Sequence, residues 1–128
     1  MGTTKAIESS RASVAHRAAI RTPVAEQVGF LSDQLGQSLV AYLAGVSDTK
    51  TVRRWIQNEQ TPREESKARV QTAFQVYQFL LQYDSMYTVR AWFVGINPQL
   101  QDTSPSTAIR ESRLEDVMIA ARAFASGG

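Results

Sequence analysis

The sequence predicts an all-α protein, with a three-helix half followed by a smaller helical half. From Pro23 onward, apolar residues recur at spacings of three and four, which is the period of an amphipathic helix. Pro or a capping residue stands where several of these runs begin, and Gly stands where several end. No run alternates apolar and polar residues between two turns, as a strand would. With 128 residues and 43% hydrophobic content, the chain can pack a core as one domain or two small ones.

Residues 1–22 form a leader rich in Ser, Thr, Ala and Arg. Four basic side chains against the single acid Glu8 give the leader a local charge of +3. We expect a flexible basic arm in the absence of a partner, because so few large apolar residues cannot bury a core. A weak helix is the alternative, since Val14 and Ala15 lie near one helical face with other small residues.

Residues 23–61 are expected to form three helices joined by short turns, the arrangement called helix-turn-helix. The apolar residues of the first helix recur at spacings of four, three and four before Gly36, namely Val24, Val28, Leu31 and Leu35. A short second helix is expected to end at Gly45. Three apolar residues mark the inner edge of the third helix: Val52, Trp55 and Ile56.

Residues 62–83 are expected to form one long helix that connects the two halves. Thr61 can cap its first turn, Pro62 suits the first helical position, and Glu64 can complete a capping box. The apolar stripe that follows is unusually wide, and comprises Val70, Ala73, Phe74, Val76, Tyr77, Phe79, Leu80 and Leu81. This width predicts burial on more than one side.

Residues 84–128 are expected to form the second half. An aromatic helix from Met86 to Val94 should end at Gly95 in a left-handed conformation. Asn97-Pro98 then turns the chain, and Ser104-Pro105 starts a further short helix. The last helix is expected to bury one apolar face: Leu114, Val117, Met118, Ala121, Phe124 and Ala125.

Composition argues against several kinds of chemistry. The chain has no cysteine and one histidine, His16, so it offers neither thiolates nor a second imidazole for a metal site. It has no phosphate-binding glycine loop, and the acidic pair Glu115-Asp116 is expected to be a solvated helix face. We therefore expect no enzyme activity, no cofactor and no metal. No apolar run approaches membrane-spanning length, and a cytoplasmic location is expected.

The helix from Thr49 to about Ile56 is the candidate DNA-binding element. Its outer edge carries polar and basic side chains that can reach phosphates or base edges: Thr49, Lys50, Thr51, Arg53, Arg54 and Gln57. Net charge is only +2, so affinity for nucleic acid has to come from local clustering. Residues 48–69 hold six basic and four acidic side chains, and an ordinary amphipathic helix with a solvated basic face explains the pattern equally well.

Two groups of motifs resemble known proteins. Gly45-Val46-Ser47, Thr51-Val52, Arg54-Trp55 and Thr61-Pro62 resemble the recognition-helix region of Xre/Cro-type repressors. The later motifs Tyr87–Phe93, Asn97-Pro98-Gln99-Leu100 and Ser104-Pro105, with the terminal helix, resemble the toxin-binding domain of Xre/MbcA/ParS-type antitoxins. Together the resemblances cover residues 24–128, in the family's order. They imply an Xre/Cro-like helix-turn-helix half followed by a toxin-binding half.

The resemblance implies a protein partner. Antitoxins of this family are encoded beside a RES-domain toxin that consumes NAD, and their C-terminal part covers the toxin's active-site cleft. Many also repress their own operon, and some retain a degenerate helix-turn-helix that only dimerises. The expected toxin-contacting residues are Trp92, Phe93, Asn97, Pro98, Arg122, Phe124, Ser126, Gly127 and Gly128. Two alternatives stay open: Phe124 can equally be a core residue, and of Trp92 and Phe93 one can be core and the other presented.

The sequence thus predicts a type II antitoxin that sterically blocks a RES-domain toxin and represses its own operon as a homodimer. Symmetric operator half-sites require a two-fold symmetric protein, and one helix-turn-helix offers little interface. The alternatives are a stand-alone Xre-like regulator without a toxin partner, and a structural adaptor whose helix-turn-helix is degenerate.

Overall fold

The computed structural model describes residues 11–16 and 22–127 of the chain, and over these residues it confirms the all-α prediction. The regular elements are helices, and one isolated antiparallel bridge joins Asn97 to Thr103. The helices are α2 (Val24–Leu35), α3 (Gln37–Ala44), α4 (Thr49–Ile56), α5 (Glu64–Leu80), α6 (Met86–Val94), the 3-10 turn η1 (Pro98–Leu100), α7 (Pro105–Arg110) and α8 (Leu114–Ala125). Residues 11–16 form a further short helical segment.

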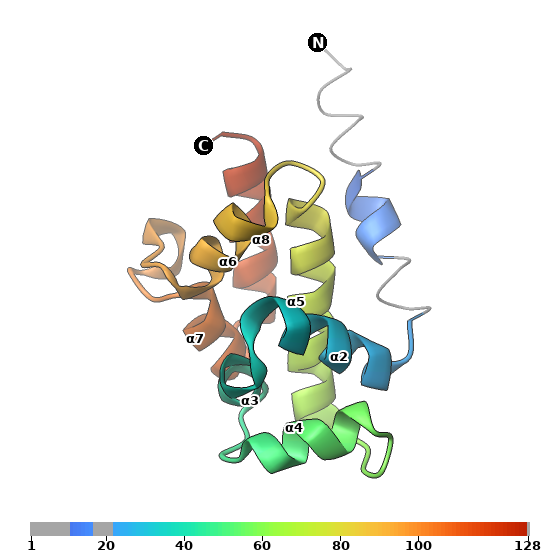
Figure 1. Ribbon diagram of the computed structural model, residues 1–128. Helices are drawn as coiled ribbons and strands as arrows, with labels where there is room; N and C mark the ends of the chain where they lie inside the picture. Colours follow the sequence, from blue (N-terminus) through green and yellow to red (C-terminus); the bar gives the residue numbers. More distant parts are fainter. Residues whose placement is uncertain (1–10, 17–21, 128) are drawn as a thin grey trace.

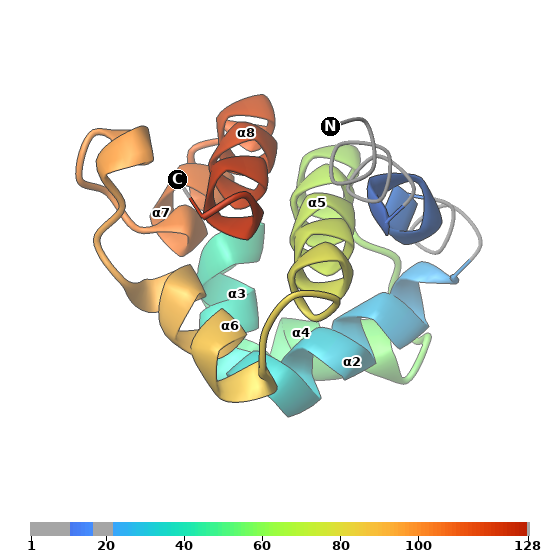
Figure 2. The same cartoon turned by 90° about the horizontal axis from the view of Figure 1, so that it is seen from above.

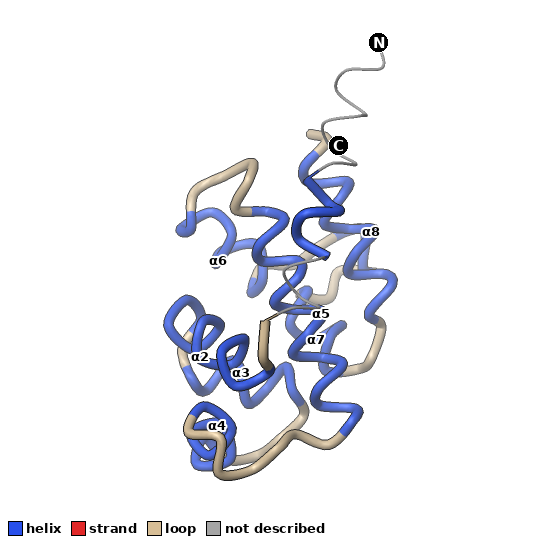
Figure 3. The backbone as a smooth tube through the Cα atoms, turned by 90° about the vertical axis from the view of Figure 1, so that its right-hand side faces the viewer, coloured by secondary structure: helices blue, strands red, loops and turns tan. Residues whose placement is uncertain are grey.

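Helix α5 is the central column of the fold (Figure 1). Helix α8 runs beside it, and α2 packs across it on another side, as the view from above shows (Figure 2). Helix α3 packs against α4, α5 and α7, and so links the early and late parts of the chain. Helix α4 lies at one end of the molecule and the end of α8 at the other, and the side view agrees (Figure 3).

One aromatic cluster ties the predicted halves together. The ring of Phe30 in α2 meets Phe74 and Tyr77 of α5 edge to face, with centroid distances of 5.4 and 5.6 Å. Tyr77 then stacks on Phe93 of α6 at 5.4 Å. Tyr77 and Phe93 are fully buried, so α5 is covered from two sides, as the width of its apolar stripe predicts.

Two arginines from distant helices hold the end of α3. Arg69 of α5 donates to the carbonyl of Ala44 at 3.2 Å, and Arg110 of α7 donates to the carbonyl of Tyr42 at 2.6 Å. Cations at a helix C-terminus donate hydrogen bonds to its free carbonyls and interact favourably with the negative end of the helix dipole. Gly45 follows with φ of 83°, and a Cβ there would lie 2.4 Å from the Arg69 guanidinium. The Arg69 side chain could shift away from a Cβ, so it is the positive φ that favours glycine in the turn into α4.

Three expectations about helix ends are wrong. Arg63 is extended, with ψ of 158°, so α5 begins at Glu64 without a side-chain cap and Thr61 lies too early to cap it. Helix α5 also ends at Leu80, before Tyr83. Gly95 has φ of −82° and is extended, not left-handed, because the chain continues directly to the bridge that pairs Asn97 with Thr103.

Part of the leader is ordered against the core, contrary to the expectation of a flexible arm. In the segment 11–16, Arg11 donates to the carbonyl of Gln82 at 3.2 Å, and its guanidinium lies 4.6 Å from the ring centroid of Tyr83. Ala15 is buried against the α5 and α8 side of the core. The alternative of a weak helix is therefore correct for these six residues, whereas residues 1–10 and 17–21 lie outside the described part of the chain.

The buried hydroxyl of Tyr77 predicts a loss of stability in alkali. Burial raises the pKa of Tyr77 above its usual value, and the nearby charge of Arg90 partly opposes this. Because the folded-state pKa is raised, the stability is complete below about pH 10 and is lost as the pH rises through the higher folded value. We expect Tyr77→Phe to show a smaller fall in the free energy of unfolding above pH 10 than wild type.

The matched control for this prediction is Tyr87→Phe, because Tyr87 is 73% exposed. Urea unfolding at a series of pH values measures the free energy of unfolding of wild type and of both variants. At neutral pH, Tyr77→Phe should cost about 1 kcal/mol, since the hydroxyl donates to Gln34 at 3.0 Å. An alkaline decline in Tyr77→Phe as steep as that of wild type would contradict the assignment.

Candidate functional site

The first candidate surface is the outer side of α4, which we call the α4 surface: Thr49, Lys50, Thr51, Arg53, Arg54 and Gln57. Asp48 caps the helix by accepting from the Lys50 amide at 2.8 Å. Val52 and Trp55 are buried and fix the helix to the core. The two threonines are half-buried, and the other four side chains are exposed.

The cations of the α4 surface are available to an external partner. Lys50, Arg53 and Arg54 form no ion pair with any residue that the structure describes. Exposed cations without a carboxylate partner suit long-range attraction of an anionic ligand such as DNA. Asp48 at the start of the helix is also exposed and weakens this attraction locally.

A cleft of about 320 Å³ lies beside the start of α4, between α3 and α7. Ser38, Ser47 and Thr49 bring hydroxyls to it, and Arg110 places its guanidinium 4.7 Å from the ring centroid of Tyr42. Arg110 therefore adds a fourth cation next to the α4 surface. Sequence reasoning missed it because α7 is distant in the chain from α4, and only the packing of α7 on α3 brings them together.

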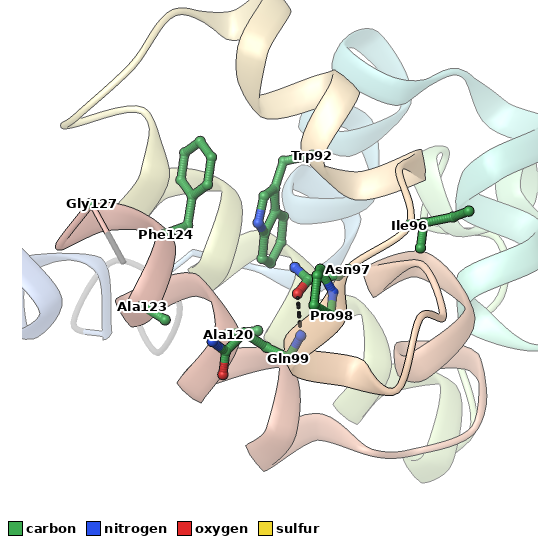
Figure 4. Close-up of a pocket in the computed structure, with 9 residues that line it drawn as sticks. All are labelled: Trp92, Ile96, Asn97, Pro98, Gln99, Ala120, Ala123, Phe124 and Gly127. Carbon is green, nitrogen blue, oxygen red and sulfur yellow. Dashed lines mark hydrogen bonds between the residues drawn. The ribbon is translucent and has the colours of Figure 1, made fainter.

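The second candidate surface is a pocket of about 470 Å³ formed by the end of α6, the turn η1 and the last turns of α8 (Figure 4). We call it the α6–α8 pocket. Its lining residues are Trp92, Ile96, Asn97, Pro98, Gln99, Ala120, Ala123, Phe124 and Gly127. The rings of Trp92 and Phe124 form its aromatic wall, with centroids 6.2 Å apart. None of the lining side chains is charged, so the pocket suits an apolar ligand group.

The loop that supplies part of this pocket is held by several hydrogen bonds. The side-chain oxygen Oδ1 of Asn97 accepts from the backbone N–H of Gln99 at 2.9 Å. The backbone N–H of Asn97 donates to the Thr103 carbonyl at 3.1 Å. Arg113 donates to Thr103 Oγ1 at 3.2 Å and also to the side chain of Gln101. The same guanidinium pairs with Glu111 and Asp116 at 3.5 and 3.4 Å. The loop is therefore fixed before any ligand binds.

The structure brings together five of the nine residues expected to contact a toxin: Trp92, Asn97, Pro98, Phe124 and Gly127. Of the adjacent aromatics, Phe93 is fully buried and Trp92 is 9% exposed, so both belong to the core and Trp92 also lines the pocket. Gly128 lies outside the described residues.

One expectation about α8 is wrong, and two of the expected toxin-contacting residues lie outside the pocket. Phe124 is 36% exposed and so does not belong to a buried face, because Val117, Ala120 and Ala121 form that face. Arg122 does not line the pocket and instead borders a separate crevice against the segment 11–16. Ser126 does not line it either, and its hydroxyl donates to the Arg122 carbonyl at 2.7 Å. The expected contacts of Arg122 and Ser126 with a toxin stay predictions.

Sequence reasoning missed four lining residues: Ile96, Gln99, Ala120 and Ala123. One of them, Ile96, could have been identified from the sequence. Ile96 is an aliphatic residue between Gly95 and Asn97 that belongs to no helical stripe, and it is 78% exposed. An isolated large apolar residue in a turn is a reasonable marker of a binding surface.

The described residues include no group of three or more His, Cys, Asp or Glu side chains that could hold a metal ion. Over the same residues, no helix is both long and apolar enough to cross a membrane. Comparison of the chain with protein-family models, with curated proteins and with solved structures gave no match.

Proposed function

We propose that this protein is a type II antitoxin that binds a RES-domain toxin through the α6–α8 pocket and sterically blocks the toxin's NAD-consuming active site. The observation that carries the proposal is that five residues named by the family resemblance line one open, uncharged pocket. These residues come from α6, from Asn97 and the start of η1, and from the end of α8 and the turn after it, so chain proximity alone does not explain their meeting. In this proposal the protein is a binding protein without catalytic activity and acts in the cytoplasm.

The α4 surface supports a second activity, which is binding to operator DNA. Its three cations have no described ion-pair partner. Helix α4 lies at the opposite end of the molecule from the end of α8, whose residues line the pocket, so a ligand in the pocket leaves α4 accessible (Figure 1). We propose that a homodimer uses two such surfaces to repress its own operon, because palindromic half-sites require two recognition helices. The α4 surface alone would suit the alternative function, a stand-alone regulator without a toxin.

Co-purification tests the toxin partner. The chain would be co-expressed with a tagged RES-domain protein encoded beside it, and NAD consumption would be measured with and without the chain. We expect a stable complex, and we expect NAD consumption to be lost when one molar equivalent of the chain has been added per toxin site. A RES-domain neighbour whose activity is unaffected by saturating chain would exclude the antitoxin function and leave the regulator.

Arg53 and Arg54 provide the test of DNA binding. The double variant Arg53→Ala/Arg54→Ala should lower affinity for the promoter DNA by at least about tenfold at physiological salt. It should also reduce the slope of log affinity against log salt by about two, because two phosphate contacts are lost. Titration of labelled promoter DNA at several salt concentrations measures both quantities.

The control for this variant is Arg90→Ala/Arg122→Ala, which removes the same charge from two exposed positions on α6 and α8. Its salt slope should match that of wild type. If both double variants lower the affinity equally, the attraction reflects net charge and not a contact made by α4.

A further inference from the structure

The α6–α8 pocket carries two hydrogen-bond donors that its apolar character does not explain. We infer that it receives an apolar side chain of the toxin together with the neutral backbone carbonyls next to it, and that Asn97 Nδ2 and Trp92 Nε1 each donate to one of these carbonyls. The inference rests on the proposed function and names the chemistry of its ligand.

Asn97 is the first donor. Its side chain is only 9% exposed, and Oδ1 accepts from the Gln99 amide at 2.9 Å. This bond fixes the orientation of the side chain, so the NH₂ group is the part that remains for other partners. No residue that the structure describes accepts from Nδ2. Nδ2 is not among the buried unpaired atoms of the described residues, so it stays open to the pocket, and an acceptor that arrives with a ligand can reach it.

Trp92 is the second donor. Trp92 as a whole residue is also 9% exposed and lines the pocket, and none of the described residues accepts from Nε1. In Figure 4 the indole lies between Phe124 and Asn97, and its nitrogen is on the edge toward Phe124. The two donors therefore face different parts of the pocket. A backbone segment carries one neutral carbonyl oxygen per residue, so one bound segment can supply an acceptor to each donor.

The absence of charge in the lining selects a neutral acceptor. None of the nine lining residues is ionisable, so a carboxylate would leave water without gaining a cation. Burial of an unpaired carboxylate costs far more than burial of a hydrogen-bonded carbonyl. The pocket volume of about 470 Å³ falls in the usual range for ligand sites and accommodates a side chain with its peptide unit.

The surroundings of the pocket favour a protein segment over a small molecule. Ile96 is 78% exposed and Val94 is 58% exposed, and both lie at the end of α6 next to the pocket. Ile96 lines the pocket but Val94 does not, so a small molecule inside the pocket would leave Val94 in water. A protein partner would cover this apolar surface with the contacts that surround its buried anchor side chain.

Asn97→Asp is the central test. The aspartate keeps an oxygen to cap η1 and replaces only the donor, so the fold should be retained and thermal unfolding checks this. Calorimetric titration with the RES-domain toxin should show affinity reduced by at least about tenfold, because the carbonyl loses a donor and meets a negative charge. Gln101→Glu makes the same chemical change in the same loop outside the pocket, and should bind within about twofold of wild type.

A spectroscopic signature separates a hydrogen bond from general contact. The chain has two tryptophans, Trp55 and Trp92, so an ¹⁵N-labelled sample gives two indole signals. On toxin binding, the Trp92 signal should move downfield and become protected from hydrogen exchange, while the Trp55 signal stays in place. The variant Trp92→Phe identifies the signal and should weaken binding about fivefold or more.

Each outcome has a distinct meaning. If Phe124→Asp abolishes the complex while Asn97→Asp binds like Gln101→Glu, the toxin uses the pocket without this carbonyl contact, and the inference is wrong while the proposed function stands. If Phe124→Asp also binds normally, the proposed function itself fails. A Trp92 indole that is already protected in a concentration-dependent dimer of the free chain would mean that a second copy fills the pocket, which also overturns the inference.

Discussion

Replacement of Phe124 by Asp is expected to weaken toxin binding by a factor on the order of 100, the range found for central anchor residues of interfaces. Phe124 is 36% exposed and shares the wall of the α6–α8 pocket with Trp92. A carboxylate there removes the aromatic contact and places an unpaired charge against an uncharged lining. Isothermal titration of the purified variant with the toxin measures the effect, and loss of inhibition of NAD consumption is its functional counterpart.

The control for Phe124→Asp is Ile119→Asp. Ile119 lies on the same helix, is 51% exposed and does not line the pocket, so this variant adds the same charge elsewhere. Both variants should unfold within a few degrees of wild type, because neither position is in the core. Equal losses of affinity would show that the toxin responds to charge on α8 in general, and would remove the pocket from the binding site.

Replacement of Phe93 by Ala is expected to destabilise the whole fold by about 3–5 kcal/mol. Phe93 is fully buried, stacks on Tyr77 at 5.4 Å and meets Trp92 edge to face at 5.3 Å. Domains of this size usually have a free energy of unfolding of about 5–15 kcal/mol, so the loss is a large share of the total. Urea unfolding followed by circular dichroism measures it.

The neighbouring residue supplies the control for this second prediction. Val94 is 58% exposed, and Val94→Ala should change stability by no more than about 0.5 kcal/mol. Because Phe30, Tyr77 and Phe93 connect α2, α5 and α6 in one cluster, both variants should unfold in a single transition. A separate early transition in Phe93→Ala that leaves α2–α4 folded would show that the two halves are independent.

The early helices could be predicted closely because their ends depend on single residues. Gly36 and Gly45 adopt positive φ values of 87° and 83° immediately after α2 and α3, and few other residues tolerate this conformation. The same local logic predicted Ser104 as the cap of α7, where its hydroxyl accepts from the Thr107 amide at 3.1 Å. It failed at Thr61, because the extended conformation of Arg63 delays the start of α5.

The candidate site could be predicted only in part. A sequence pattern can assign Trp92, Asn97 and Phe124 to separate elements, but their meeting depends on how α8 packs beside η1. Periodicity placed Phe124 in the core because it continues the stripe of α8, yet the small residues Ala120 and Ala121 face the core and Phe124 turns to Trp92. Arg110 was missed for the same reason, since its contact with Tyr42 is tertiary.

The distance between the two candidate surfaces has a thermodynamic consequence. Helix α4 lies at one end of the molecule, and the end of α8, whose residues line the pocket, lies at the other (Figure 3). A toxin bound in the pocket would project away from a DNA duplex bound to α4. The chain would therefore bind both ligands at the same time, and neither would displace the other. Titrations of DNA with and without saturating toxin should then superimpose. Any displacement between the two curves is the coupling free energy that α5 and its neighbours transmit.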